Sequence, residues 1–313
     1  MPLFIGDGRR DEARTDLNFN IDKRDGLPKI NIKNSFCNHF NSAATQCGED
    51  ASFKDIFGTM DTAIKDEWAE ILGTAPSPDL SKSLQGALNR AHGAWYEYII
   101  SIESWNYSVA NDSFLLVNLP NKNGFSVHQL YTREFSGKID DFKEKLQSVG
   151  ADLITSNPDF AIVANPETRF EDERCTIDTE SVSPRDIEAL EELYRTFTGS
   201  LHLNDLKGFV SAKTSFRADR LFQMPHEAST MKALYIHLQT RDWIIDAPGI
   251  KYYSMAMGYG RKDTENLKTV ATHSITTVQH RPEPVVDRLF KVDSIRSLHE
   301  SFEAIDSDIA GSV

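Results

Sequence analysis

Residues 209–227 read FVSAKTSFRADRLFQMPHE, and this stretch decides which fold the chain is expected to adopt. It begins with a short apolar run that ends near Lys213, continues through an arginine-rich turn, and reaches Glu227 just before a helical pattern. Side chains alternate between the two faces of a strand, so Ser211 and Lys213 are expected to share one face. The stretch therefore predicts a strand, a polar turn and a helix, with charged side chains at the strand end and at the helix start.

A second segment supplies another carboxylate. Asp159 follows Asn157-Pro158 and directly precedes the apolar run FAIVA, a predicted buried strand. Taken singly, an acid at a strand start is most often structural, and a lysine at a strand end is usually solvated. Together, Asp159, Lys213 and Glu227 can converge on one point. Mg²⁺ prefers oxygen ligands, usually one or two carboxylates, and it activates bound water. The pattern therefore indicates metal-assisted phosphodiester hydrolysis, with the lysine stabilising the charge that develops.

The turn after the strand carries Arg217, Asp219 and Arg220. Arginine can bind O6 and N7 of guanine with two hydrogen bonds, and aspartate can accept from N4 of cytosine. These three residues are therefore candidate readers of G·C pairs. The alternative is an exposed Arg–Asp–Arg ion-pair network without a role in recognition.

The pattern SAKTSFRADRLFQMPHE, preceded by SNPD and a strand, resembles the CCGG-recognising restriction endonucleases. These Cfr10I/Bse634I/NgoMIV/SgrAI-like enzymes form a branch of the PD-(D/E)xK nucleases. The general pattern has an acid two residues before the lysine, where this chain has Ser211. The branch commonly moves that carboxylate to the following helix, where Glu227 lies. The resemblance covers about residues 85–245, and neither residues 1–50 nor the C-terminal part can be matched to it.

This resemblance implies roles for the site residues. Asp159 and Glu227 would bind Mg²⁺, Lys213 would orient the nucleophilic water, and Ser211 would support the metal site. The segment GAWYEYIISIESWN resembles the family's acidic helix, so Glu97 is expected to be a further metal ligand.

A second acid in that segment, Glu103, is the rival to Glu97. The two lie six residues apart, and they are therefore on different faces of the helix.

The resemblance also implies an activity and an assembly. The expected enzyme is a Mg²⁺-dependent type II restriction endonuclease that cuts double-stranded DNA at a palindrome containing CCGG, or CCNGG. Cleavage before the first C would leave 5′ overhangs with 5′-phosphate ends. A palindrome implies a two-fold homodimer, and many relatives form tetramers. At the end of the recognition helix, Arg241 is a candidate for outer-base contacts and Trp243 for subunit packing.

Two other functions stay open. A structure-selective repair or recombination nuclease would share the fold, but it would leave Arg217, Asp219 and Arg220 without a role. A DNA-binding protein without catalysis would leave the acid–lysine–acid set unexplained.

Composition sets the remaining bounds. The 313 residues carry a net charge of −13, so DNA contact is expected in a local cationic cleft. No apolar run approaches the ~20 residues of a membrane helix, and the start of the chain lacks a secretory pattern, so a bacterial cytoplasmic protein is expected. The odd number of cysteines argues against a disulfide scaffold. Cys37, His39 and Cys47 lack a fourth ligand at finger-like spacing and are not expected to bind metal.

Strand and helix patterns alternate along the chain and predict an α/β class: a PD-(D/E)xK restriction-endonuclease-like core with a central mixed β-sheet flanked by helices. Residues 1–110 are expected to form an N-terminal arm and helical region packed on the catalytic and recognition core of 111–313, together one structural domain. The first fifty residues are expected to be irregular. Helices are predicted over 53–72, 84–109, 139–149, 183–197 and 228–239, and strands over 114–119, 160–164, 209–214, 252–257 and 274–278.

Overall fold

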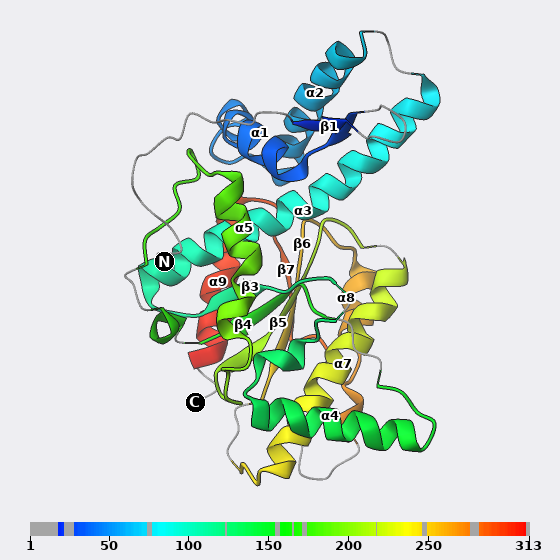
Figure 1. Ribbon diagram of the computed structural model, residues 1–313, viewed down its shortest axis with the longest axis vertical. Coiled ribbons are helices and arrows are strands. Elements are labelled where there is room, and N and C mark those ends of the chain that lie inside the picture. Colours follow the sequence, from blue (N-terminus) through cyan, green and yellow to red (C-terminus); the bar gives the residue numbers. More distant parts are fainter. Residues whose placement is uncertain are drawn as a thin grey trace.

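The centre of the computed structural model is a five-stranded sheet with the order β3-β4-β5-β6-β7 (Figure 1). The strands are β3 (Leu115–Asn118), β4 (Phe160–Val163), β5 (Leu206–Lys213), β6 (Lys251–Ala256) and β7 (Arg288–Lys291). β3, β4 and β5 pair antiparallel, whereas β5, β6 and β7 pair parallel. The sheet is therefore mixed, as expected.

The structure describes residues 18–21, 28–73, 77–122, 124–153, 157–164, 166–170, 174–216, 218–245, 249–275 and 282–310, without the side chains of 21, 169 and 218–221. The helices within these ranges are α1 (Ile32–Cys47), α2 (Phe53–Leu72), α3 (Pro78–Asn111), α4 (Arg133–Ser148), α5 (Pro184–Glu192), α6 (Tyr194–Phe197), α7 (Ala218–Arg241), α8 (Arg261–Leu267) and α9 (Ile295–Ala310). None of them is long and apolar enough to cross a membrane.

Helices flank the sheet, with α7 and α8 at one side and α5 and α9 at the other, while α3 crosses above it (Figure 1). This arrangement confirms the expected α/β class. The long helix α3 begins where Ser77 accepts a hydrogen bond from the backbone N–H of Leu80, with Pro78 in the first turn. It therefore starts six residues before Leu84, the predicted beginning.

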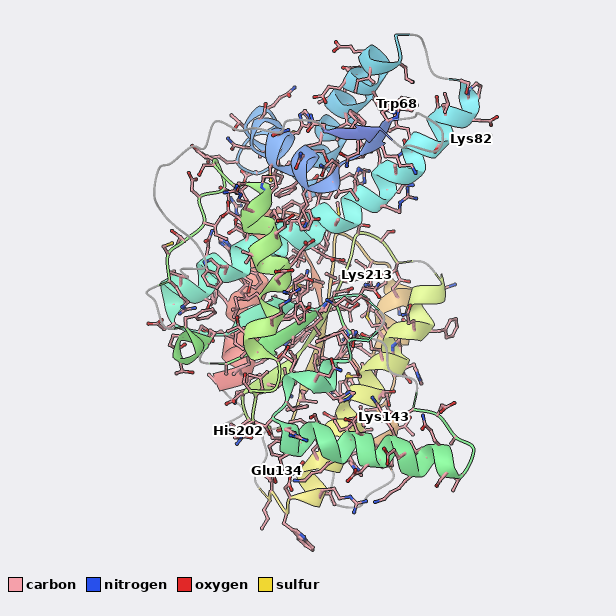
Figure 2. The ribbon with its side chains drawn as sticks, viewed as in Figure 1. Trp68, Lys82, Glu134, Lys143, His202 and Lys213 are labelled. Atoms are coloured by element: carbon pink, nitrogen blue, oxygen red, sulfur yellow. The ribbon has the colours of Figure 1, made fainter. Side chains whose placement is uncertain are left out.

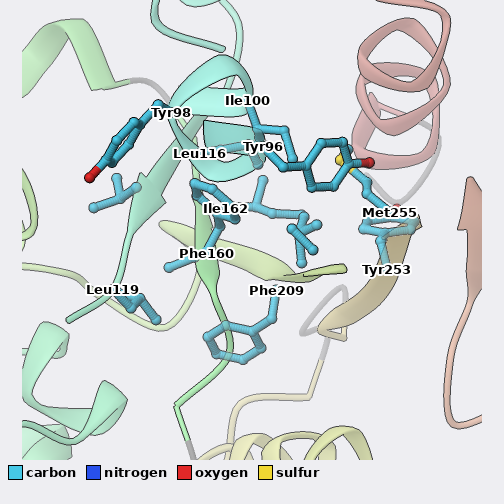
Figure 3. Packing of buried hydrophobic residues seen from close by; sticks show 14 of the residues in the cluster. Tyr96, Tyr98, Ile100, Leu116, Leu119, Phe160, Ile162, Phe209, Tyr253 and Met255 are labelled. Carbon is cyan, nitrogen blue, oxygen red and sulfur yellow. The ribbon is translucent and has the colours of Figure 1, made fainter. Parts of the chain in front are cut away.

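One apolar core joins the sheet to the N-terminal helices. Figure 3 shows side chains of α3, such as Tyr96 and Ile100, packed with Phe160 of β4 and Phe209 of β5. The hydroxyl of Tyr96 donates to the backbone carbonyl of Val292, just after β7, at 2.9 Å. The N-terminal region is thus continuous in packing with the sheet.

Glycine at position 208 allows β5 and β6 to approach closely. A Cβ atom at this position would lie 2.6 Å from the backbone carbonyl of Lys251, which no side chain tolerates. Gly208 is the register partner of Lys251, so it brings the start of β6 against β5.

The expectation of an irregular N-terminal region was wrong for residues 28–50. Strands β1 (Phe19–Ile21) and β2 (Pro28–Ile30) pair antiparallel, and α1 follows. The apolar face of α1 is narrow, because its large buried side chains are only Phe36 and Phe40. Such a helix is stabilised mainly by tertiary packing and gives a weak periodic signal.

Further boundaries differ from the predictions: α4 begins at Arg133 instead of residue 139, and β5 at Leu206 instead of residue 209. α7 begins at Ala218 instead of residue 228, so it continues through Pro225, which the sequence suggested as a boundary. Residues 272–275 form a 3-10 turn where a strand was expected, and residues 276–278 of that prediction lie outside the described residues. The predicted helix of 53–72 and strand of 252–257 are confirmed to within one residue.

Candidate active site

Asp159 is the centre of a hydrogen-bonded cluster at the junction of β4 and β5. Its Oδ2 accepts from the hydroxyl of Ser211 at 3.1 Å, the backbone N–H of Ala212 at 2.7 Å and the ammonium of Lys213 at 2.5 Å. The chain here is fixed by β3, because the N–H of Leu119 donates to the backbone carbonyl of Asp159 at 2.9 Å. Of the three residues expected to converge, Asp159 and Lys213 are therefore in direct contact, and Ser211, expected on the same strand face as Lys213, joins them.

All three donors contact the same carboxylate oxygen. No donor in the described part of the chain contacts Oδ1 of Asp159, so this oxygen can face another ligand. The side chains of Asp159 and Lys213 are about one-fifth exposed, at 20% and 18%. Figure 2 shows Lys213 in the middle of the molecule, below α3. The pair is thus partly desolvated but reachable by solvent and substrate.

Glu227 lies inside α7 and is buried, with 6% of its surface exposed. The hydroxyl of Tyr252, on β6, donates a hydrogen bond to its Oε1. The expectation that Glu227 starts a helix was wrong, because α7 begins nine residues earlier. Helical residues precede and follow Glu227, so its backbone is held more firmly than at a helix terminus.

Glu97 of α3 also belongs to this cluster. Burial and the negative charge of Asp159 raise its pKa to about 8, against the opposing effects of Lys213 and a hydrogen bond from Asn118. Its rival Glu103 is elsewhere, since its Oε2 pairs with Nε2 of His299 on α9 at 2.8 Å. The structure thus brings Glu97 toward Asp159 and directs Glu103 away.

The chemistry of this donor set suits a hard divalent cation. Asp159, Glu97 and Glu227 offer carboxylate oxygens, the ligands that Mg²⁺ prefers. The pKa of Glu97 is raised first by its burial and then by the negative charge of Asp159, which Lys213 offsets only in part. Within the described ranges no three His, Cys, Asp or Glu side chains are grouped closely enough to hold a metal ion by themselves. Mg²⁺ fits such an open site because it usually keeps several water and phosphate ligands.

We expect Glu97→Gln to stabilise the metal-free protein at high pH. A carboxyl whose pKa is raised on folding costs stability progressively as pH rises from the unfolded value of 4.5 to the folded value of about 8. Glutamine cannot ionise, so in EDTA the melting temperature at pH 9 should rise by about 2–4 °C, roughly 1 kcal/mol after discounting for solvent screening. Differential scanning calorimetry at pH 5 and pH 9 measures this.

The matched control is Glu103→Gln on the same helix, which loses its ion pair with His299 and should not gain stability. A pH 9 gain equal in both variants would contradict the proximity of Glu97 to Asp159.

The side chains of three of the four candidate base-reading residues lie outside the described part of the structure. Arg217 lies outside the described residues, as do the side chains of Asp219 and Arg220, whose backbone belongs to the first turn of α7. Arg241 is exposed at the other end of α7, about 21 Å from Glu227 along a helix rising 1.5 Å per residue. Trp243 follows it and is 87% exposed. Arg241 is therefore not part of the carboxylate cluster.

Tyr252 and Asn118 were missed by the sequence reasoning. Both sit at sheet positions that only the strand register brings to the site: Asn118 is paired with Phe160, and Tyr252 with Phe209. A buried strand tyrosine and a strand-end asparagine carry no distinguishing signal along the chain.

The chain is similar to known proteins of one family. A model of the family described as Cfr10I/Bse634I restriction endonuclease matches residues 20–307. The type II restriction enzyme Cfr10I from Citrobacter freundii is 41% identical over 217 residues, which are 68% of this chain and 76% of that enzyme. Two solved structures of the restriction endonuclease Bse634I, one a crystal structure with cognate DNA, superpose with a TM-score of 0.79 and 26% identity, covering 93% of this chain and 98% of theirs. The match extends well beyond residues 85–245, so it includes N-terminal and C-terminal parts that the resemblance could not reach.

Proposed function

The chain belongs to the Cfr10I/Bse634I restriction endonuclease family, and from this we propose that it cuts double-stranded DNA at a palindrome containing CCGG or CCNGG. It is a restriction enzyme by family, a hydrolase that acts on DNA. The observation that carries the proposal is the contact of Lys213 with Asp159, with Glu97 electrostatically coupled to both. A relative of the same fold, Bse634I, has been crystallised with its cognate DNA, which supports DNA as the partner.

Mg²⁺ is the proposed cofactor. Its ligands would be the carboxylates of Asp159, Glu227 and Glu97, and Asp159 would bind through Oδ1. The three carboxylates would hold one ion or be shared between two. A bound Mg²⁺ supplies an activated water at neutral pH and offsets charge on the phosphorus.

The chain's own residues then have distinct tasks. Lys213 holds the attacking water in line with the scissile phosphate and stabilises the charge that develops on its oxygens. Ser211 and the N–H of Ala212 fix Oδ2 of Asp159, so that its other oxygen keeps one direction. Cleavage before the first C leaves 5′-phosphate ends and 5′ overhangs.

Arg217, Asp219 and Arg220 are the proposed readers of the inner G·C pairs, and Arg241 is proposed for outer bases. Arg217 is four residues after Lys213 in the sequence, so the candidate base-reading segment follows the strand that ends at the catalytic lysine. Because the net charge is −13, DNA contact is confined to such local cationic segments.

The test is digestion of a DNA of known sequence with Mg²⁺, followed by sequencing of the ends. The expected result is cutting at every copy of one palindrome that contains CCGG or CCNGG, with 5′-phosphates and 5′ overhangs at the ends. No cutting is expected in EDTA. Cutting at branched or flapped DNA without sequence preference would favour a repair nuclease instead. Binding without cutting in Mg²⁺ would favour a non-catalytic DNA-binding protein.

A homodimer follows from a palindromic site, and we propose that Trp243 serves a further dimer–dimer contact. Trp243 and Ile245 expose 87% and 86% of their surface beside the ion pair of Lys138 with Asp242. Large exposed apolar groups of this kind mark interaction surfaces.

We expect Trp243→Ala to convert tetramers into dimers, because removing one aromatic anchor at an interface typically costs about 2 kcal/mol or more. Light scattering after size-exclusion chromatography measures the mass. Val149→Ala, which also removes an exposed apolar side chain, is the control and should leave the mass unchanged. A Trp243→Ala protein that stays tetrameric would rule this surface out.

A further inference from the structure

Tyr252 lies between Glu227 and Asp159, two of the three carboxylates of the site. It is completely buried on β6, with 0% of its surface exposed. In the register of β5 and β6, Tyr252 is paired with Phe209, and Ser254 with Ser211. Residues two apart share a face of a strand, so Tyr252 is on the same face of the sheet as Ser211 and Lys213.

The phenol contacts both sides of the site. Its hydroxyl donates to Oε1 of Glu227 and is also within hydrogen-bonding reach of the Ser211 hydroxyl. Ser211 in turn contacts Oδ2 of Asp159. A chain of contacts therefore runs from Glu227 through Tyr252 and Ser211 to Asp159, which joins a helix-borne carboxylate to a sheet-borne one.

The backbone of Tyr252 is itself held from the far side. Its N–H donates to Oδ2 of Asp287 at 2.8 Å, and the N–H of Asp287 donates back to the carbonyl of Tyr252 at 2.8 Å. Asp287 also pairs with the buried ammonium of Lys232 on α7 at 2.9 Å. Tyr252 is thus clamped to the sheet and, through Asp287 and Lys232, to the helix that carries Glu227.

We propose that Tyr252 is a positioning residue that fixes the direction of the Glu227 carboxylate toward the cation. The proposal rests on the proposed function, because it assumes that Glu227 binds the metal. A carboxylate free to rotate loses affinity when it must be ordered, and a hydrogen bond to one of its oxygens removes that freedom. Such outer contacts of metal ligands typically change metal affinity by about 10–100-fold.

Tyr235 offers a matched control. It is a buried tyrosine of the same helix α7, 2% exposed, and its hydroxyl has no hydrogen-bond partner among the described residues. Tyr235→Phe and Tyr252→Phe therefore remove the same atom from buried sites, but only the second removes a contact to Glu227.

The experiment measures Mn²⁺ binding to the full chain by calorimetry or electron paramagnetic resonance, and then the Mg²⁺ dependence of cleavage. Tyr252→Phe should weaken Mn²⁺ binding by about 10-fold or more and raise the Mg²⁺ concentration for half-maximal cleavage equally. The rate at saturating Mg²⁺ should stay within a few-fold of wild type, and Tyr235→Phe should match wild type throughout. Unchanged Mn²⁺ and Mg²⁺ dependence in Tyr252→Phe would overturn the proposal while leaving the proposed function intact.

A double-mutant cycle tests the route of action. If Tyr252 acts through Glu227, Tyr252→Phe should have no further effect on Mn²⁺ binding in a Glu227→Ala background. An equal loss in both backgrounds would overturn the proposal. Equal Mn²⁺ binding by wild type and Glu227→Ala would instead remove Glu227 from the metal site and overturn the proposed ligand set with it.

A measurement on unsubstituted tyrosine covers the case in which Tyr252→Phe does not fold. Ca²⁺ should perturb the ultraviolet absorption of a buried phenol in wild type and in Tyr235→Phe, but not in Glu227→Ala. Ca²⁺ binding with no tyrosine perturbation in wild type would count against the proposal.

Discussion

Lys213→Ala is expected to bind its DNA site and leave it uncut. The ammonium is the only cationic group that contacts Oδ2 of Asp159 within the described part, and the variant loses its stabilisation of charge at the phosphate. Removing one electrostatic stabiliser of a transition state typically costs about 10²–10³ in rate. Single-turnover cleavage of a CCGG-containing plasmid in Mg²⁺ measures the loss, and a gel shift in Ca²⁺ measures retained binding.

The control for this substitution is Lys207→Ala at the start of the same strand, six residues away. At about 3.3 Å per residue it lies roughly 20 Å from Lys213, too far to act at the phosphate, so its cleavage rate should match wild type. If Lys213→Ala cuts as fast as wild type, the catalytic role of the lysine is wrong.

Arg217→Ala is expected to show the opposite pattern, with weaker and less selective binding. Each bidentate contact to a guanine contributes about 1–3 kcal/mol of discrimination, and a homodimer makes each contact twice. Competition gel shifts in Ca²⁺, with CCGG against a duplex altered at one inner pair, give the selectivity directly. A duplex altered at one inner pair loses one such contact, so a loss of about 5-fold to 150-fold in selectivity corresponds to that range.

Salt dependence separates base reading from phosphate binding. Arg296→Ala, a surface arginine of α9 that pairs with Asp50, is the control and should change neither selectivity nor its salt slope. If Arg217→Ala lowers the affinity for all sequences by the same factor and flattens the salt slope, Arg217 is a phosphate contact and not a base reader.

Much of the candidate site was predictable because its chemistry is local in the sequence. Ser211 and Lys213 are two residues apart on one strand, so their shared face follows from strand geometry alone, and both do contact Asp159. The apolar run after Asp159 marked β4. The roles of these residues stay predictions until the substitutions above are measured.

Two features of the site could not be predicted from the sequence: which acid of α3 joins it, and where α7 begins. The choice between Glu97 and Glu103 depended on where α3 crosses the sheet, and only that crossing directs one toward Asp159 and the other toward His299. The start of α7 was misplaced because Pro225 is a typical boundary signal. α7 nevertheless continues through Pro225, because Met224, Ala228 and further apolar side chains of this helix are packed in the core.

By itself, then, the sequence determined the kind of chemistry and the class of fold. Residue type and short-range periodicity suffice to predict Asp159 and Lys213 at the ends of strands and Glu227 on the following helix. Only the tertiary structure decided which distant groups complete the site: Glu97 from α3, and Tyr252 from β6, which donates a hydrogen bond to Glu227 of α7. The reason is physical. Strand register and helix crossing are fixed by packing of the whole core, and no stretch of chain carries that information alone.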